Sequence, residues 1–239
     1  MTCLAALGSC LRRSTCCAQT ERLLRTFDNP ATTAVFEDYQ ARIVSERSLF
    51  SNLSAGTGAV SRDDLLLPVG PEVGAFLHAL VLARRPARIL ELGTSYGYST
   101  LFLADAARQV GATVITMELA DYKQAYAREK LTAAGLVDVV DFRLGDAVAL
   151  IEVDEGPFDL VLLDIWKDVY LPCFEAFYPK LSEEAVIAAD NMIDPASARD
   201  SVRRYRAAVV AKPDLQTALL PIGQGVELTV KWSAGNPKL

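Results

Sequence analysis

Residues 88–99, which read RILELGTSYGYS, contain the turn that decides the fold. An apolar run of strand length leads into two glycines, and a helical pattern follows them. Glycine lets a backbone turn sharply and approach a ligand closely. Gly93 and Gly97 are spaced G-x-x-x-G, with the bulky Tyr96 between them, whereas a dinucleotide fingerprint needs G-x-G-x-x-G to seat a pyrophosphate. The turn therefore suits a nucleoside cofactor without phosphates, and a purely structural turn is the alternative.

The same alternation of strand and helix continues to the end of the chain. Short apolar and β-branched runs predict strands at residues 88–92, 113–117, 137–144, 158–163, 185–189, 216–220 and 227–232. Helical patterns lie between Pro71 and Pro86 and at residues 99–109, 122–134, 147–153, 170–178 and 196–211. This alternation predicts an α/β, doubly wound, Rossmann-like fold with a seven-stranded, mostly parallel sheet covered on both faces. The last two strands have no helix between them and are predicted to form a terminal antiparallel hairpin.

The composition limits the possible functions. Of the 239 residues, 51% are hydrophobic and 23% are charged, as in a globular protein. The net charge of −6 argues against a broad basic surface for nucleic acid, although Arg199, Arg203, Arg204 and Arg206 form a local basic cluster. Because His78 is the only histidine, a Ser-His-Asp triad or a multi-histidine zinc site is nearly excluded. No apolar run is long enough for a membrane span.

The first 60 residues differ from the rest of the chain. Four of the five cysteines lie within residues 1–20, which are predicted to form a tail. Their distribution indicates a reducing compartment, so we expect a cytoplasmic protein. Residues 21–60 form a separate segment, in which helical spacing runs from Glu21 to Phe50, Pro30 is predicted to separate two helices, and a loop begins at Asn52. This segment is interpreted as a cap or a dimerisation element, and residues 61–239 as the main domain.

Polar residues follow the predicted strands at their carboxyl ends, where ligands bind in a sheet of this kind. Glu118 ends the second strand, 25 residues after Gly93. A carboxylate there can accept hydrogen bonds from both hydroxyls of a ribose, and a solvated strand-end charge is the alternative. After the third strand, the turn Gly145-Asp146-Ala147 offers a polar group where the edge of an adenine ring would lie.

The fourth and fifth strands end in a set of oxygen-bearing side chains. Asp164 follows the fourth strand, and Asp190 and Asn191 follow the fifth. Two carboxylates and an amide oxygen suit Mg²⁺ or Ca²⁺ rather than Zn²⁺, and helix capping is the alternative role for both aspartates. Lys167 lies a short turn after Asp164, where it is placed to take a proton or is simply an exposed lysine. Tyr170 is expected to pack or bond locally.

Together, the segments LELGTSYGYST, Gly145-Asp146-Ala147, DIWKDVY and Asp190-Asn191, with Glu118, resemble the cation-dependent S-adenosylmethionine O-methyltransferases, which include the caffeoyl-CoA and catechol O-methyltransferases and bacterial relatives. The similarity extends from about Val69 to Trp232 and implies a class I methyltransferase fold, S-adenosylmethionine as cofactor and a homodimer. The resemblance implies cofactor contacts from Val69, Glu91, Gly93, Thr94, Ser99, Glu118, Ala147 and Asp164. It also implies that Mg²⁺, or another hard cation such as Mn²⁺ or Ca²⁺, is bound by Asp164, Asp190 and Asn191.

The resemblance further implies methyl transfer to a hydroxyl of a small catechol-like or polyphenolic acceptor, with Lys167 and Asp164 as catalytic residues. The chain departs from the family pattern around the acceptor, at Ile165, Trp166 and residues 192–195. Two other functions stay open, namely methylation of a hydroxylated tRNA nucleoside and silent binding of S-adenosylmethionine. A nicotinamide oxidoreductase is disfavoured by the missing third glycine. We expect a small hydroxylated aromatic partner, no membrane, and no nucleic acid.

Overall fold

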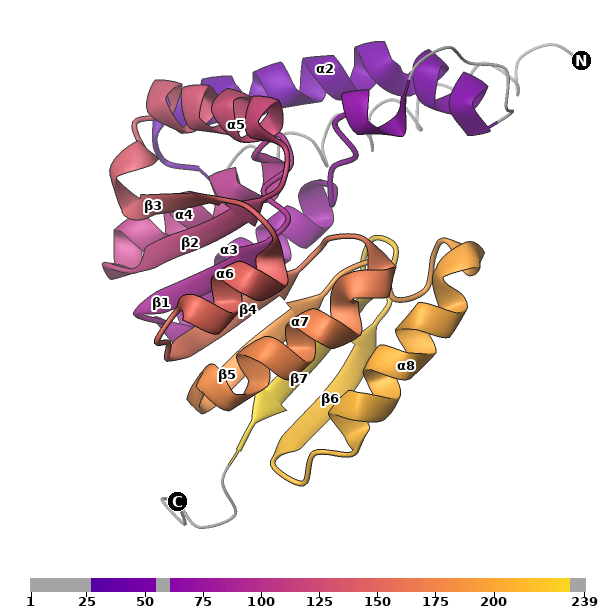
Figure 1. Ribbon diagram of the computed structural model, residues 1–239. Coiled ribbons are helices and arrows are strands. Elements are labelled where there is room, and N and C mark those ends of the chain that lie inside the picture. Colours follow the sequence, from indigo (N-terminus) through magenta and orange to yellow (C-terminus); the bar gives the residue numbers. More distant parts are fainter. Residues whose placement is uncertain (1–26, 55–60, 233–239) are drawn as a thin grey trace, which may run out of the picture.

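Seven strands form one sheet in the computed structural model, which describes residues 27–54 and 61–232. The strands run in the order β3-β2-β1-β4-β5-β7-β6 (Figure 1). The first five in this order are parallel, and β7 runs antiparallel to both β5 and β6. The strands are β1 (Arg88–Leu92), β2 (Thr113–Glu118), β3 (Val140–Leu144), β4 (Phe158–Leu163), β5 (Leu181–Ala189), β6 (Leu215–Leu220) and β7 (Val226–Lys231). The predicted doubly wound sheet with a terminal hairpin is confirmed.

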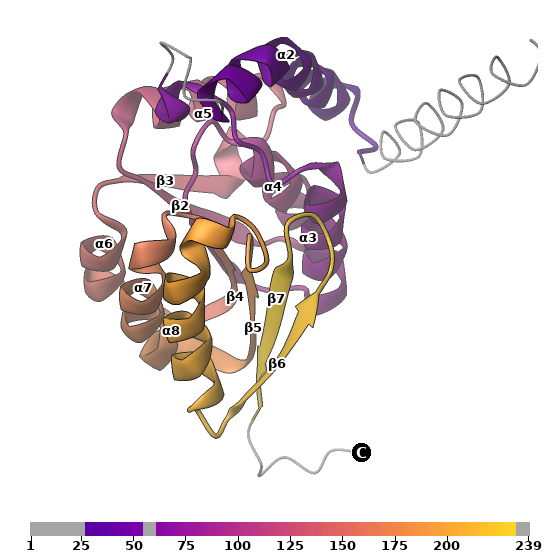
Figure 2. The same cartoon turned by 90° about the vertical axis from the view of Figure 1, so that its right-hand side faces the viewer.

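Helices cover both faces of this sheet (Figures 1 and 2). Parallel strands need such crossover connections, because consecutive strands enter the sheet from the same end. One face carries α2 to α5, and the other carries α6 to α8. The helices are α2 (Pro30–Ser54), α3 (Pro71–Arg84), α4 (Tyr98–Val110), α5 (Asp121–Ala133), α6 (Ala147–Val153), α7 (Tyr170–Phe177) and α8 (Arg199–Val210).

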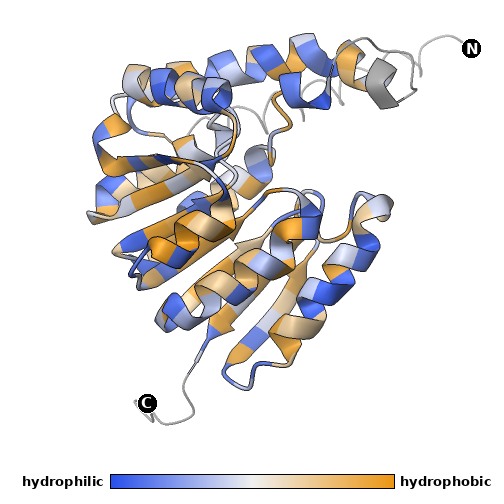
Figure 3. Cartoon of the chain, viewed as in Figure 1, coloured by the Kyte–Doolittle hydropathy of each residue, from blue (hydrophilic) through white to orange (hydrophobic). Residues whose placement is uncertain are grey.

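Side chains of the central strands alternate between two hydrophobic cores. Ile89 of β1 and Leu160 of β4 are register partners and enter the core beneath α3 and α4. Their neighbours Leu90 and Val161 are also register partners and enter the core beneath α6 to α8. All four side chains are fully buried, and Figure 3 shows apolar residues along these strands with polar ones on the outer helix surfaces. Burial on both faces explains why these strands read as continuous apolar runs.

Two predicted strands have different starts. Residues 137–144 were expected to form one strand, but the first three form a 3₁₀ turn, η3 (Val137–Val139). The buried Leu136 still bonds back to Leu131 of α5 (N–H to O 2.8 Å), so the chain must turn before it joins the sheet. The fifth strand begins at Leu181, before the predicted residue 185, and its pairing with β4 is irregular at this end. An irregular, partly exposed strand end lacks the apolar run used for the prediction.

Helix starts also differ from the prediction. The predicted helix 196–211 begins with a 3₁₀ turn, η6 (Ala196–Ala198), before α8. Helix α2 begins at Pro30, and Asn29 caps it because its Oδ1 accepts the N–H of Ala31 at 2.8 Å. Whether a second helix precedes Pro30 falls on residues 1–26, which lie outside the described residues together with the predicted tail.

Helix α2 is hydrogen-bonded to the glycine turn and holds it in place. Tyr39 is fully buried, and its Oη donates to the backbone oxygen of Tyr96 at 2.6 Å. From the next residue of the helix, Gln40 Nε2 donates to Tyr98 Oη at 2.9 Å. The two tyrosines that flank Gly97 are therefore bonded to a helix more than 50 residues away in sequence.

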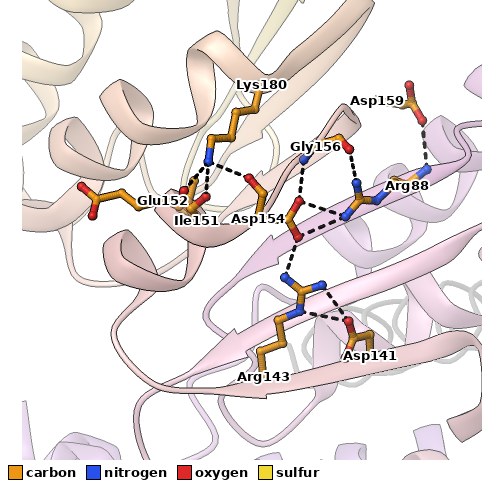
Figure 4. A network of polar contacts seen from close by, with 9 residues as sticks. All are labelled: Arg88, Asp141, Arg143, Ile151, Glu152, Asp154, Gly156, Asp159 and Lys180. Carbon is orange, nitrogen blue, oxygen red and sulfur yellow. Dashed lines mark hydrogen bonds and ion pairs between the residues drawn. The ribbon is translucent and has the colours of Figure 1, made fainter.

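A polar network ties the amino ends of β1 and β4 to the end of α6 (Figure 4). The carboxylate of Asp154 accepts from Arg88 at 3.0 Å, from Arg143 at 2.5 Å and from the N–H of Gly156 at 2.6 Å. Burial alone raises the pKa of Asp154, but these donors outweigh burial and hold its pKa below the usual range. Lys180 Nζ donates to backbone oxygens at the end of α6 at 2.6–2.8 Å. This network lies at the edge of the sheet opposite the candidate site and serves the fold.

The lone histidine and the body cysteine are structural, as expected. His78 of α3 pairs with Asp105 of α4 (Nε2 to Oδ2 2.9 Å), and both residues are 6% exposed. Cys173 is fully buried in α7. Within residues 27–54 and 61–232, no helix combines the length and apolar character needed to cross a membrane.

Candidate active site

The turn after β1 is a place where two backbone segments nearly touch. Gly93 has φ +99°, and a Cβ there would lie 2.1 Å from the backbone oxygen of Asp164 at the end of β4. Gly97 has φ +86°, and a Cβ there would lie 2.8 Å from the Cβ of Ala127 on α5. No larger residue fits either position without moving the backbone. Both glycines thus have structural reasons to be present, and the first brings the turn against Asp164.

Glu91 is a fully buried carboxylate beneath this turn. It accepts hydrogen bonds of 2.6 Å from the hydroxyls of Ser99, Thr100 and Thr116. Burial raises its pKa to about 7, with Asp164 adding to the rise and the three hydroxyls opposing it. Thr94 extends the cluster, because its Oγ1 lies 2.5 Å from Thr116 Oγ1. Three predicted cofactor residues, Glu91, Thr94 and Ser99, therefore share one hydroxyl-rich cluster.

Glu118 ends β2 beside the same turn. Its Oε2 accepts the N–H of Ser95 at 2.8 Å, and its Oε1 accepts the N–H groups of Leu119 and Ala120 at 3.0 Å. Ser95 has φ +46°, an uncommon conformation for a non-glycine residue that this hydrogen bond helps to hold. Glu118 therefore orients the turn, and as a charged acceptor it retains capacity for ligand hydroxyls.

The third predicted contact, after β3, has a clear local role. Asp146 is the N-cap of α6, and its Oδ1 accepts the N–H of Ala149 at 2.9 Å. Ala147 is the first residue of that helix. Asp146 therefore serves as a helix cap, and its role beside an adenine ring stays a prediction.

Some of the predicted cofactor residues line one pocket, and others lie outside it. A small pocket brings together residues from the turn, from the end of β4 and from the segment before α3. It is lined by Leu66, Leu67, Pro68, Val69, Gly93, Thr94, Ser95, Tyr96, Tyr98, Ser99 and Asp164. Glu91 lies beneath this pocket, whereas Glu118, Asp146 and Ala147 lie at the ends of β2 and β3 and do not line it.

Asp164 and Asp190 follow two residues that are register partners, Leu163 of β4 and Ala189 of β5. The N–H of Asp190 also donates to the backbone oxygen of Leu163 at 3.1 Å. Asp190 is 1% exposed, and among the described residues its Oδ1 accepts no hydrogen bond. Burial, together with the neighbouring charge of Asp164, raises its pKa to about 7. Burial also raises the pKa of Asp164, against the opposing charge of Lys167.

Asn191 is held by the turn between β6 and β7. It has φ +53°, and its Nδ2 donates to Gln224 Oε1 at 3.4 Å. The next N–H, of Met192, donates to the oxygen of Gly225 at 2.9 Å, and Met192 packs into the core beneath α6 to α8. This arrangement leaves the amide oxygen of Asn191 outside the hydrogen bond to Gln224. The unusual residues after Asn191 therefore fasten the loop to the terminal hairpin.

Lys167 is not an exposed surface lysine. Its side chain is 13% exposed, and Nζ lies 3.8 Å from Asp164 Oδ1 and 3.2 Å from the oxygen of Ile165. Nζ also donates to Tyr170 Oη. Burial lowers the pKa of Lys167, with the charges of Asp164 and Asp190 opposing this effect. A lysine in such surroundings releases its proton more readily than a solvated one.

Tyr170 proves more central than its sequence position indicated. It is fully buried at the start of α7, and its Oη donates to the backbone oxygens of Leu163 at 2.8 Å and Asp190 at 3.1 Å. One hydroxyl thus connects the ends of β4 and β5 with Lys167. Thr100 and Thr116 were also missed by the sequence analysis. Buried hydroxyls next to a strand that contains Glu91 are the signal that would have found them.

The end of β4 and β5 has the chemistry of a hard-cation site. In the described part of the chain, no group of three or more His, Cys, Asp or Glu side chains gathers to hold a metal. Asp164 and Asp190 are two carboxylates whose charges repel, one of them with an unpaired buried oxygen, and Asn191 adds an amide. A divalent cation would relieve this repulsion and satisfy the unpaired oxygen. The donor set therefore fits a hard cation.

A sheet in this order, with a glycine turn after β1 and polar side chains at the ends of β2, β4 and β5, defines a class I methyltransferase fold. A family model described as a methyltransferase domain matches residues 90–192. The O-methyltransferase ankF of Aspergillus thermomutatus is 33% identical over 174 residues, which cover 61% of this chain and 71% of that protein. The chain belongs to the O-methyltransferase family.

Other similar proteins are also named O-methyltransferases. The catechol O-methyltransferase of Niastella koreensis is 35% identical over 131 residues, which cover 53% of this chain and 59% of that protein. The chain thus matches little more than half the length of this relative. Among solved structures, the O-methyltransferase from Bacillus cereus in complex with SAH has a TM-score of 0.62 and 27% identity, covering 78% of this chain and 89% of that one. TomG from Streptomyces achromogenes, in complex with SAM, has a TM-score of 0.65 and 26% identity, covering 71% and 84%.

Proposed function

We propose that this chain transfers the methyl group of S-adenosylmethionine to a hydroxyl of a small catechol-like or polyphenolic acceptor, with the help of Mg²⁺ or a similar hard cation. The observation that carries the proposal is the carboxylate pair at the ends of β4 and β5, the partly exposed Asp164 and the buried Asp190 with its unpaired Oδ1, beside the largely buried Lys167. An unpaired buried carboxylate oxygen lowers the stability of the fold, so the requirements of folding do not explain why it is there. Relatives named catechol and caffeoyl-CoA O-methyltransferases support the acceptor class.

In this proposal, the cofactor is held between the turn at Gly93 and the segment before α3 that includes Val69. Thr94, Ser99 and Glu91 shape the floor of the pocket. Glu118 accepts the ribose hydroxyls, and the turn at Asp146 and Ala147 lies at the adenine edge. The cation is held by Asp164, Asp190 and Asn191. When bound, the sulfonium cofactor supplies an activated methyl group, and the cation supplies positive charge that stabilises an ionised acceptor oxygen.

The remaining work falls to side chains of this chain. Lys167 takes the proton of the acceptor hydroxyl at Nζ, because burial lowers its pKa toward the range of a general base. Tyr170 holds Nζ and the ends of β4 and β5 in fixed relative positions. Trp166 offers a flat wall for an aromatic ring. Since the methyl group arrives activated, alignment of the acceptor oxygen is the main task of the protein.

The test is methyl transfer from labelled S-adenosylmethionine to a panel of catechols, with Mg²⁺ or with EDTA. We expect turnover that is abolished by EDTA and by Asp164→Ala. Calorimetric titration with S-adenosylhomocysteine serves as the control for folding and cofactor binding. Turnover that persists in EDTA would contradict the role of the cation. Cofactor binding without turnover of any catechol would contradict the acceptor class and favour a silent binder.

Methylation of a tRNA nucleoside receives less support. Two members of the predicted basic cluster are engaged within the protein, since Arg206 pairs with the buried Glu227 at 2.8 Å and Arg203 lies 3.4 Å from Asp200. Paired arginines offer less charge to a phosphate backbone. The Arg206 pair is the deeper of the two, and it fastens α8 to β7.

The proposal includes a homodimer that works in the cytoplasm. Val44 and Leu49 on α2 are 60% and 38% exposed, and exposed apolar side chains on one helix support an interface. Light scattering coupled to gel filtration should give twice the 25.9 kDa of the chain. A monomer mass at micromolar concentration would contradict this part of the proposal.

A further inference from the structure

Arg62 and Trp166 meet beside the proposed acceptor site, although they are far apart in sequence. The guanidinium carbon of Arg62 lies 5.7 Å from the centre of the Trp166 ring. Trp166 is 58% exposed, which is unusual for so large an aromatic residue, and it directly precedes Lys167. A cation and an exposed flat ring therefore border the place where the acceptor must approach Lys167.

The turn that carries Arg62 is anchored on both sides. It is a 3₁₀ turn, η2 (Arg62–Asp64), with a capping box. In this box, the side chains of Ser61 and Asp64 each accept a hydrogen bond from the backbone N–H of the other residue. Tyr96, from the glycine turn, donates its Oη to the backbone oxygen of Asp63 at 3.0 Å. The cofactor turn thus fixes the segment that presents Arg62. A side chain on an anchored turn loses less entropy when it binds a ligand.

The charge of Arg62 is not neutralised by its acidic neighbours. Asp63 pairs with Lys123 at 3.2 Å, and Asp64 accepts a backbone N–H at the start of the turn. Among residues 27–54 and 61–232, no carboxylate lies within ion-pair distance of the Arg62 guanidinium. Its charge also reaches Lys167, whose pKa it helps to lower. In a chain of net charge −6, the positive charge of Arg62 thus lies on the acceptor side of the site, beside the proposed base Lys167.

We propose that Arg62 and Trp166 form a subsite for an aromatic acceptor that bears a carboxylate. Trp166 carries one flat side of the acceptor ring, and the guanidinium of Arg62 binds the carboxylate through paired N–H groups. Arginine suits this role because its planar fork matches the two oxygens of a carboxylate. The inference rests on the proposed function and narrows its acceptors to dihydroxylated aromatic acids.

The experiment compares 3,4-dihydroxybenzoate with its methyl ester, which keeps the ring and its two hydroxyls but has no charge. With Mg²⁺ and S-adenosylmethionine present, kcat/KM is measured for wild type, Arg62→Ala and Arg62→Lys. We expect the wild type to prefer the acid. In Arg62→Ala, the loss on the acid should exceed the loss on the ester by about tenfold or more, mainly through KM, because a charge-assisted hydrogen bond is removed. Arg62→Lys should retain part of the preference.

Arg203→Ala is the matched control, because Arg203 is an arginine on α8 that pairs with Asp200 and has no part in the proposed subsite, with a side chain that is 77% exposed. It should leave the ratio of acid to ester unchanged. Equal losses on acid and ester in Arg62→Ala would show that Arg62 only supports its turn, and would overturn the inference. Wild type that prefers the ester would also overturn it.

Failure of the proposed function gives a different result. If the wild type methylates neither compound, the methyl acceptor class is wrong, and calorimetry then decides the subsite. Acid and ester are titrated into the protein loaded with S-adenosylhomocysteine and Mg²⁺. A preference for the acid that Arg62→Ala abolishes supports the subsite, and absence of such a preference overturns it.

Discussion

Glu91 and Asp190 are both buried carboxylates on the parallel strands of one sheet, near the carboxyl ends of those strands, and burial is the main cause that raises the pKa of each to about 7. Glu91 accepts three short hydrogen bonds from neutral hydroxyls. Asp190 has an oxygen without a donor in the described structure, and the largest effect of a neighbouring charge on its pKa comes from a second carboxylate, Asp164. The cofactor side of the site is thus satisfied by the protein itself, whereas the acceptor side holds negative charge that calls for a cation.

Among the changes that test this difference between Glu91 and Asp190, Asp190→Asn should have the largest effect on activity. The change removes the unpaired charge and the proposed metal ligand while it keeps the side-chain volume. We expect methyl transfer to fall at least about a hundredfold, since a metal ligand contributes several kcal/mol to catalysis. The free energy of unfolding at pH 8, without added metal, should rise, because an ionised buried carboxylate no longer has to be accommodated.

Initial rates and urea unfolding check this prediction, with cofactor affinity by calorimetry as the control. If the variant retains wild-type rates, Asp190 is not a metal ligand. If it is less stable than wild type at pH 8, the unpaired charge is not a cost to the fold.

Glu91→Gln tests the buried carboxylate on the cofactor side of the site. The folded-state pKa of about 7 lies above the ordinary 4.5, so the folded protein binds this proton more tightly than the unfolded chain. The unfolding free energy of the wild type therefore falls as pH rises from 4.5 to 7, by about 3 kcal/mol from this group alone. Glu91→Gln should remove that component. Urea unfolding at pH 5 and pH 8 measures it, and parallel losses in both proteins would show that Glu91 does not titrate in this range.

Tyr170→Phe should have the smallest effect of the three. Phenylalanine keeps the ring contact with Tyr205 (centroids 5.7 Å apart) but loses the hydroxyl that joins Lys167 to the ends of β4 and β5. We expect kcat to fall about tenfold and stability to fall by about 1–2 kcal/mol.

Tyr205→Phe is the matched control for this prediction. Tyr205 is equally buried, but in the described part of the chain its Oη has no hydrogen-bond partner. Its removal should cost neither stability nor rate. Equal effects of the two changes would mean that ring packing, and not the Tyr170 hydroxyl, positions Lys167.

The strand pattern was readable because the central strands are buried on both faces. Continuous apolar runs at β1, β4 and β5 and the missing helix before β7 led directly to the observed sheet. Predictions failed at irregular element ends, such as Val137–Val139 and Leu181, where tertiary contacts set the boundary. By contrast, α6 begins at Ala147 as predicted, and Asp146 caps it.

The sequence by itself determined the fold class, the glycine turn and the strand ends where Asp164, Asp190 and Lys167 lie, since these follow from local periodicity and from the rule that strand ends carry the ligands. Only the tertiary structure decided which of these groups are paired. Glu91 meets Thr116 from β2, Tyr170 reaches back to Leu163, and Arg62 meets Trp166 across more than 100 residues. Hydrogen bonding and desolvation act between residues that are close in space, and the pattern of residues along the sequence does not say which residues those are.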